Sequence, residues 1–259
     1  MTFLFFGDSF TAGAELLDHK FYPEYPTPVS LLDLDSEYIK KWKKEYKPLW
    51  QLKTKNELEN IVKEQKKHSY AHKLAELCNI EYENFAISGS SIQKIRYLLT
   101  TEVQKNNNSN LTVFVQPTGA ERWMEYVNNQ WMDFIVGNEY HDDTKEYFKF
   151  KILSNNDYSR FCVWLLEMQA MYDFCSNNDK IKDFYFVNNG TFNSIAGIQY
   201  QDLSTTYSTL ISNINQRLFH FPHTKNNEEK VFLPFGHVTE KVHEQLAIDI
   251  HSILCYNKK

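Results

Sequence analysis

The sequence predicts an α/β protein, because strand-like and helix-like segments alternate along the chain. Short apolar runs bounded by turn residues are typical of buried strands, whereas longer segments with apolar residues three or four positions apart are typical of helices. Strand, helix and strand in this order imply right-handed parallel crossovers. The expected strands are residues 3–6, 82–86, 111–116, 183–188 and either 218–221 or 231–233, and the expected helices are residues 56–78, 157–177, 202–218 and two that begin near 92 and 239.

Ser9 stands where the first expected strand turns into a helix. Gly7 and Asp8 end the apolar run of residues 3–6, which is too short for a helix or a membrane span. The carboxyl end of a parallel strand, beside the start of a helix, is where α/β sheets place ligands. Ser9 is therefore a candidate nucleophile, and the simpler interpretation is that it caps the following helix.

Composition is that of an ordinary globular chain. The 259 residues are 42% apolar and 24% charged, and they are enough for a substantial core. A net charge of −5 gives no general attraction to nucleic acid or to an anionic membrane. We expect one domain over residues 1–259, with insertions at 20–67 and 124–156. The 15% of aromatic residues suits a pocket for sugars, bases or acyl chains, although aromatic side chains are more often core.

The cysteines indicate neither a disulfide framework nor a zinc site. They are widely spaced and form no C-x-x-C pair, so we expect reduced thiols in a reducing compartment. The first apolar run lacks a basic flank and ends at Asp8, and no later apolar stretch reaches 18 residues, so we expect no signal peptide and no membrane span. The sequence therefore predicts a cytoplasmic protein without a metal or an organic cofactor. The four cysteines are Cys78, Cys162, Cys175 and Cys255.

Residues 37–50 alternate lysines with aromatic residues and allow two interpretations. One is a basic and aromatic surface for a polyanion such as nucleic acid. The other is a short amphipathic helix with Tyr38, Trp42 and Tyr46 on one side. We favour the helix, because no wider basic field accompanies the segment.

Two segments carry a family resemblance. GDSFTAG, residues 7–13, resembles block I (GDS-x-T-x-G) of the SGNH or GDSL-type hydrolases, in which the serine is the nucleophile. NFAISG, residues 84–89, resembles block II, in which the glycine presents its backbone N–H to the oxyanion. The resemblance implies this role for Gly89, and glycine suits it because a side chain would obstruct a substrate oxygen.

The third block departs from the family. PTGAERW, residues 117–123, falls where G-x-N-D would supply an asparagine donor, and it resembles instead a branch common in phages that reads T-x-x-x-R. If the chain is phage-encoded, its compartment would be the host cytoplasm. Thr118 could donate its hydroxyl in place of asparagine, with the Gln116 amide nearby.

Arg122 occupies the arginine position of that branch. It either holds an anionic substrate group or pairs with a carboxylate such as Glu121 or Glu125, and pairing is the commoner role of such an arginine. Asp8, Gln116 and Arg122 are the candidates for substrate binding, although the family's block I aspartate serves the turn itself.

PFGHVTEKVHEQLA, residues 234–247, resembles block V (D-x-H-P-x-x-x-G-H-x-x-x-A). The resemblance implies that His237 is the catalytic base and that His243 is structural. The helix that follows has an apolar stripe of Val242, Leu246, Ile250 and Ile253.

Block V lacks the family's aspartate, which precedes the histidine by two or three positions. Phe235 and Pro234 stand there, and neither side chain can accept a hydrogen bond from the imidazole. Three outcomes stay open: a Ser–His dyad oriented by a backbone carbonyl, an acid from elsewhere such as Glu228 or Glu229, or an inactive enzyme.

Taken together, the blocks imply a three-layer α/β/α sandwich of flavodoxin-like type, with a central parallel sheet of about five strands. They imply a serine esterase in which Ser9 and His237 are catalytic and Ser9, Gly89 and Thr118 form the oxyanion hole. We expect a small-molecule or carbohydrate ester, with a small O-acyl group, as the substrate. The alternatives are acyl transfer at the same site and a catalytically silent binding or virion-associated module.

Overall fold

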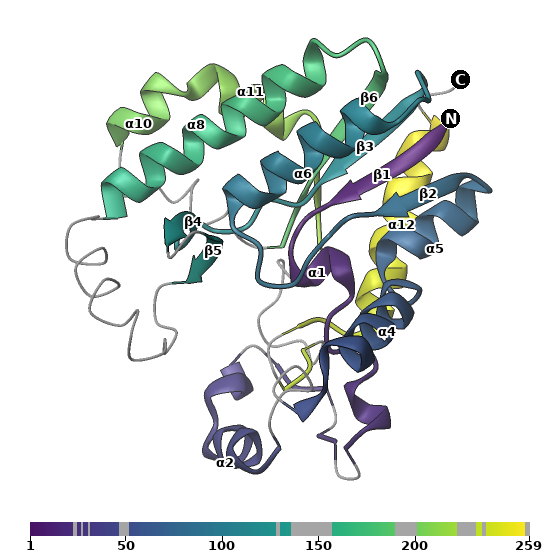
Figure 1. Ribbon diagram of the computed structural model, residues 1–259, viewed down its shortest axis with the longest axis vertical. Coiled ribbons are helices and arrows are strands. Elements are labelled where there is room, and N and C mark those ends of the chain that lie inside the picture. The colour runs from purple at the N-terminus through teal and green to yellow at the C-terminus, as the bar shows by residue number, and fades with distance from the viewer. Residues whose placement is uncertain are drawn as a thin grey trace.

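Five parallel strands form the central sheet of the computed structural model, in the order β2-β1-β3-β6-β7 (Figure 1). The structure describes residues 1–22, 25–26, 28–30, 32–46, 52–127, 130–135, 157–189, 201–221, 232–234 and 237–256. The predicted parallel α/β sheet is thus confirmed. Its strands are β1 (Thr2–Phe6), β2 (Glu81–Asn84), β3 (Leu111–Val115), β6 (Ile181–Asn188) and β7 (Leu218–His220).

The last strand resolves the choice that the sequence left open. β7 pairs with β6 over residues 218–220, whereas Phe232 forms only isolated antiparallel bridges with Val29 and Val238. The second candidate, residues 231–233, is therefore not a sheet strand within the described residues.

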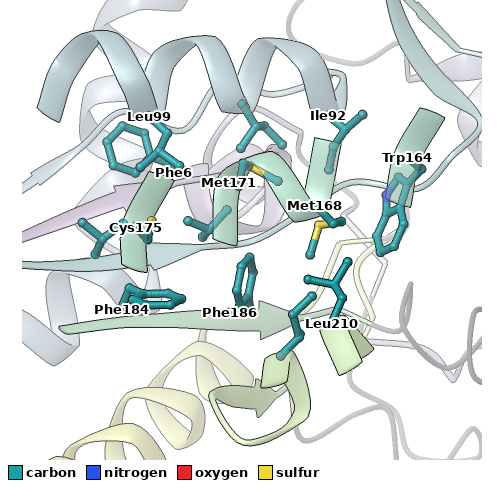
Figure 2. Packing of buried hydrophobic residues seen from close by; sticks show 14 of the residues in the cluster. Phe6, Ile92, Leu99, Trp164, Met168, Met171, Cys175, Phe184, Phe186 and Leu210 are labelled. Atoms are coloured by element: carbon teal, nitrogen blue, oxygen red, sulfur yellow. The ribbon is translucent and has the colours of Figure 1, made fainter. Parts of the chain in front are cut away.

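Helices cover both faces of the sheet (Figure 1). Leu4 and Phe6 face α6, α8 and α11, and Figure 2 shows this half of the core. Phe3 and Phe5 point the other way, toward α5 and α12, because successive strand residues alternate between faces. The helices are α1 (Ser9–Ala12), α2 (Glu37–Glu45), α4 (Lys55–Lys66), α5 (Tyr70–Cys78), α6 (Ile92–Lys105), α8 (Asp157–Ser176), α10 (Gln201–Thr206), α11 (Ser208–Asn215) and α12 (Glu240–Tyr256), with short 3-10 turns at Asp18–Lys20 and Leu32–Asp35.

Two of the expected helices are each divided in two. Residues 56–78 form α4 and α5, because Ser69 is extended and its hydroxyl donates to the Lys66 carbonyl. Residues 202–218 form α10 and α11, interrupted at Tyr207. The predictions of single helices were wrong, since periodicity alone does not reveal a one-residue change of backbone direction.

His243 joins two of the helices on one face. Its ring is buried in α12, stacks on Tyr70 and accepts a hydrogen bond at Nδ1 from the Tyr70 backbone N–H, 3.2 Å away. This bond satisfies a backbone donor in the first turn of α5, which the Ser69 side chain does not cap. Along α12, Val242, Leu246 and Ile250 are buried as expected, whereas Ile253 is 45% exposed.

The segment predicted to be an insertion, residues 20–67, contains α2 and α4, and its basic and aromatic part forms the expected short helix. The side that packs inward consists of Ile39, Trp42 and Tyr46. Tyr38 is 64% exposed, so its predicted place beside Trp42 was wrong. Isoleucine fills the buried position because its side chain has no hydroxyl that needs a partner.

Most of the predicted insertion at 124–156 lies outside the described residues. Its described part belongs to the antiparallel hairpin of β4 (Arg122–Val127) and β5 (Gln130–Ile135). In the part of the chain that the structure describes, none of the helices is long and apolar enough to cross a membrane.

Gly13→Ala should destabilise the fold by about 2–4 kcal/mol. Gly13 has φ +70°, and a Cβ there would lie 2.7 Å from the Gln65 carbonyl oxygen. Gly89→Ala is the matched control, because Gly89 has φ +81° but no described atom within 4 Å of such a Cβ, so we expect only about 1 kcal/mol. Urea unfolding of the two variants measures the difference, and equal losses would contradict the steric account.

Candidate active site

The GDS-x-T-x-G segment forms a tight turn, and the identities of four of its residues are explained by packing or helix capping. A Cβ on Gly7 would lie 2.7 Å from the Thr11 hydroxyl, and the Asp8 carboxylate caps α1 by accepting from the Phe10 N–H at 3.1 Å. Thr11 donates to the Gln116 side-chain oxygen at 3.2 Å, and Gly13 ends the helix in the left-handed conformation. Packing and capping therefore account for these four positions.

Ser9 is the residue of this segment that the packing does not explain. Asp8, not Ser9, is the helix cap, so the simpler interpretation of the serine fails. Ser9 is the first residue of α1 and is 4% exposed, and its hydroxyl forms no hydrogen bond with another described residue. A hydroxyl held at the carboxyl end of the central strand without a structural partner is suited to chemistry.

Blocks II and III lie beside block I at the carboxyl end of β1. The Ile87 N–H donates to the Gly7 carbonyl at 3.1 Å, which brings the turn with Gly89 beside the serine strand. On the other side the Gln116 N–H donates to the Phe6 carbonyl at 2.8 Å. Gly89 keeps open space beside its Cα, whereas Thr118 is buried and its carbonyl accepts from the Trp164 indole at 2.6 Å.

His237 is paired with an acid that the sequence did not indicate. The carboxylate of Glu15 lies 3.1 Å from His237 Nδ1 and accepts from the His237 backbone N–H at 3.2 Å, both through Oε2. Glu15 is thus a candidate for the acid from elsewhere. Glu228 and Glu229, which we named as examples, lie outside the described residues.

This pairing sets the tautomer of the imidazole. A proton on Nδ1 satisfies the carboxylate and leaves Nε2 unprotonated, which is the form that a general base requires. The ring centroid of His237 lies 5.5 Å from that of Phe10, the residue after Ser9. His237 therefore lies against the turn that carries the serine, and contacts between nucleophile and base often tighten only when substrate binds.

Glu15 is held in a strained and buried position. Its φ is +70°, which is uncommon for a residue with a side chain, and it is 4% exposed. Its second oxygen accepts from the Tyr25 hydroxyl at 2.5 Å. Strain of this kind persists where the surroundings over-determine a conformation, and it is common at functional sites.

Tyr25 comes from the first insertion and is held by an aromatic cluster. Its ring stacks on Tyr22 and lies edge-on to Trp42, which in turn stacks on Tyr46. The predicted insertion therefore supplies a hydrogen bond to Glu15.

Asp18 adds a second buried carboxyl beside this group. Burial raises the pKa of Asp18 to about 7, with repulsion from Glu15 as the next cause. The electrostatic interaction with His237 and the hydrogen bond from the Gln65 amide, at 3.2 Å, act in the opposite direction. The Glu15–His237 pair thus borders a carboxyl that is half protonated near neutral pH.

The three predicted substrate-binding residues lie beside the serine turn. Asp8 caps α1, and Gln116 is fully buried, where its oxygen accepts from the Asp8 N–H and its amide donates to the Pro117 carbonyl. Arg122 Nη1 lies 3.5 Å from Asp8 Oδ2. The pairing expected for Arg122 thus includes Asp8, which we had not named, as well as Glu121, whose carboxylate lies 3.9 Å from Nε.

Comparison with known proteins supports the fold. No family model and no curated protein matches the chain. Among solved structures it is similar to an acetyl xylan esterase (Est2A) of Butyrivibrio proteoclasticus, with a TM-score of 0.51 at 10% identity over 99% of this chain and 64% of that one.

Two further solved structures are similar to this chain. One is a lipolytic protein of the G-D-S-L family from Desulfitobacterium hafniense, with a TM-score of 0.46, 12% identity and cover of 97% and 98%. The other is a family two carbohydrate esterase from Clostridium thermocellum, with a TM-score of 0.48, 13% identity and cover of 99% and 64%. The chain spans 64% of the length of each of the two esterases, and it shares its fold with the acetyl xylan esterase.

Asp18→Asn should remove a pH dependence of stability. In the folded protein the pKa of Asp18 is about 7, against an ordinary value of 3.8, so the folded state keeps a proton that the unfolded chain releases between these values. Stability due to this group is therefore present below about pH 4 and is lost as the pH rises to about 7, on the order of a few kcal/mol.

Thermal unfolding at about pH 5 and about pH 8 measures this effect. Relative to the native chain, Asp18→Asn should gain stability at the higher pH. Asp249→Asn is the control, because Asp249 lies on the exposed face of α12, and it should show no such gain. A gain that is the same at both pH values would contradict the shifted ionisation.

Proposed function

We propose that this chain is a serine esterase of the SGNH type. The observation that carries the proposal is the contact of the buried Glu15 carboxylate with His237 Nδ1, beside the turn that presents Ser9. It provides an acid at the point where the family's aspartate is missing. The fold, which is shared with esterases, supports the same reaction class.

Acylation would begin with attack of Ser9 Oγ on the ester carbonyl carbon. The serine proton passes to His237 Nε2, and the Glu15 carboxylate stabilises the imidazolium that forms. The carbonyl oxygen becomes an oxyanion, which accepts hydrogen bonds from the backbone N–H groups of Ser9 and Gly89 and from the Thr118 hydroxyl.

Collapse of this intermediate releases the alcohol and leaves an acyl-serine. His237 Nε2 gives its proton to the departing alcohol oxygen and becomes a base again. It then removes a proton from water, which attacks the acyl carbon to form a second tetrahedral intermediate. This intermediate breaks down to the carboxylic acid as His237 Nε2 returns the proton to Ser9 Oγ. All groups that move protons in this cycle belong to the chain.

The substrate we propose is a small O-acyl group on a carbohydrate. The structure with which this chain shares its fold at a TM-score of 0.51 is named an acetyl xylan esterase. The block resemblance and the high aromatic content of the chain agree with such a substrate.

Treatment with a fluorophosphonate followed by intact mass measurement tests the nucleophile. We expect one adduct on the native chain and none on Ser9→Ala, because the reagent labels only an activated serine. Absence of an adduct would favour the catalytically silent binding module. Product analysis with an added acceptor alcohol then separates hydrolysis from acyl transfer.

Glu15→Gln should lower kcat/KM for an acetyl ester by about 10²–10⁴. The glutamine keeps the size of the side chain, but it removes the charge that stabilises the imidazolium and can turn an N–H toward His237. Initial rates with 4-nitrophenyl acetate measure the loss.

Glu76→Gln is the matched control, because Glu76 also contacts a histidine, His72 at 3.3 Å, but on the exposed surface of α5. It should keep the native rate. If Glu15→Gln is as active as this control, Glu15 is not the acid of the triad.

A further inference from the structure

A cavity of about 360 Å³ lies at the end of the sheet away from Ser9. Its floor consists of the first residues of β1, β3 and β6, and its other walls are the last turns of α5 and α12. Figure 1 shows this end of the sheet near the labels of the two chain termini, on the side away from α1. The volume lies within the range of small-molecule pockets. Its lining includes Phe3, Cys78, Thr112, Tyr185, Leu254 and Cys255.

Thr112 is a polar residue in the floor whose hydroxyl has no role in the fold. It is in register with Phe3 on β1 and with Asp183 on β6, so these side chains share the face of the sheet that packs on α5 and α12. Thr112 is 4% exposed, and its hydroxyl forms no hydrogen bond with another described residue. Because a buried hydroxyl without a partner is unfavourable, a ligand in the cavity that bonds to it would be stabilised.

The charged groups of the lining leave Thr112 as the buried hydrogen-bonding group for a ligand. Asp183 is already occupied, since its Oδ2 accepts from the Tyr185 hydroxyl and its Oδ1 from Arg217 Nη1, each at 2.6 Å. Lys182 also lines the cavity, but it is exposed, so water and salt screen its charge. A neutral ligand is therefore expected.

Two helix ends also disfavour an anion in this cavity. α5 ends at Cys78 and α12 at Tyr256, and the cavity is lined by residues of both last turns. The carboxyl ends of helices carry a partial negative charge, which repels a carboxylate or a phosphate and attracts the hydrogen of a hydroxyl group.

The remaining walls favour an aromatic ring. Phe3 and Tyr185 both pack on the ring of Phe114, with centroids 5.3 Å and 5.5 Å from it, and this row of rings forms part of the floor. The sulfur atoms of Cys78 and Cys255 belong to the other walls. Aromatic rings pair favourably with one another, and sulfur atoms contact ring edges favourably.

We propose that this cavity binds a small neutral phenol. The phenol hydroxyl bonds to the Thr112 hydroxyl, and the ring packs against Phe3 and Tyr185. The site lies at the opposite end of β1 from Ser9, so it is a second binding site and does not depend on the proposed esterase.

Calorimetric titration of the full chain with phenol, toluene and benzoate tests the proposal. Toluene carries a methyl group in place of the hydroxyl, and benzoate carries a negative charge on the same ring. We expect phenol to bind, and benzoate to bind at least about tenfold more weakly, because its charge would be desolvated beside two helix carboxyl ends.

Variants of Thr112 assign the hydrogen bond. Thr112→Val keeps a branched side chain that suits a strand, and it should lower the ratio of phenol affinity to toluene affinity at least about fivefold. Thr112→Ser keeps the hydroxyl and should retain most of the native ratio. Thr100→Val is the matched control, because Thr100 bonds to the backbone of α6 on the other face of the sheet, and it should leave the ratio unchanged.

Circular dichroism of Thr112→Val verifies that the variant is folded before its binding is compared. The proposal is overturned if phenol does not bind to the native chain, or if benzoate binds as tightly as phenol. It is also overturned if folded Thr112→Val keeps the native ratio, because the phenol hydroxyl would then be bound elsewhere.

Discussion

The candidate site depends on one buried carboxylate. Glu15 Oε2 accepts hydrogen bonds from the backbone N–H and from the ring Nδ1 of His237. Glu15 Oε1 accepts a hydrogen bond from the Tyr25 hydroxyl. These bonds connect the amino-terminal turn, the first insertion and the carboxyl-terminal loop. Without the carboxylate the imidazole would have no described side chain to fix its tautomer, and in the proposed mechanism Ser9 would lack an oriented base.

The contact between Glu15 and His237 is made by a residue whose backbone is strained. Gly13 ends α1 with φ +70°, and Glu15 also adopts φ +70°. A residue with a side chain is destabilised there by about 1–3 kcal/mol. The aromatic cluster around Trp42 packs against Tyr25, which donates to Glu15, so the predicted insertion contributes a contact to the candidate site.

The sequence could predict the sheet and the turn of block I because those signals are local. Apolar runs mark strands, and in block I Gly7, Asp8, Thr11 and Gly13 each meet a short-range packing or capping requirement. Glu15 could not be predicted in this way, because its contact with His237 joins residues 222 positions apart and depends on a left-handed backbone at a residue that is not glycine. One signal was present, since Glu15 is an acid two residues after the block I glycine, but the family pattern directs attention to the residues before the histidine. The break at Ser69 and the exposure of Tyr38 also depend on tertiary packing rather than on periodicity.

The most direct test of this account is the protonation of His237, measured by ¹⁵N NMR of the imidazole and assigned by loss of the signals in His237→Asn. The account predicts a proton on Nδ1, a downfield resonance for that proton, and loss of this resonance in Glu15→Gln. A proton on Nε2, or a spectrum that Glu15→Gln leaves unchanged, would show that Glu15 does not orient the base.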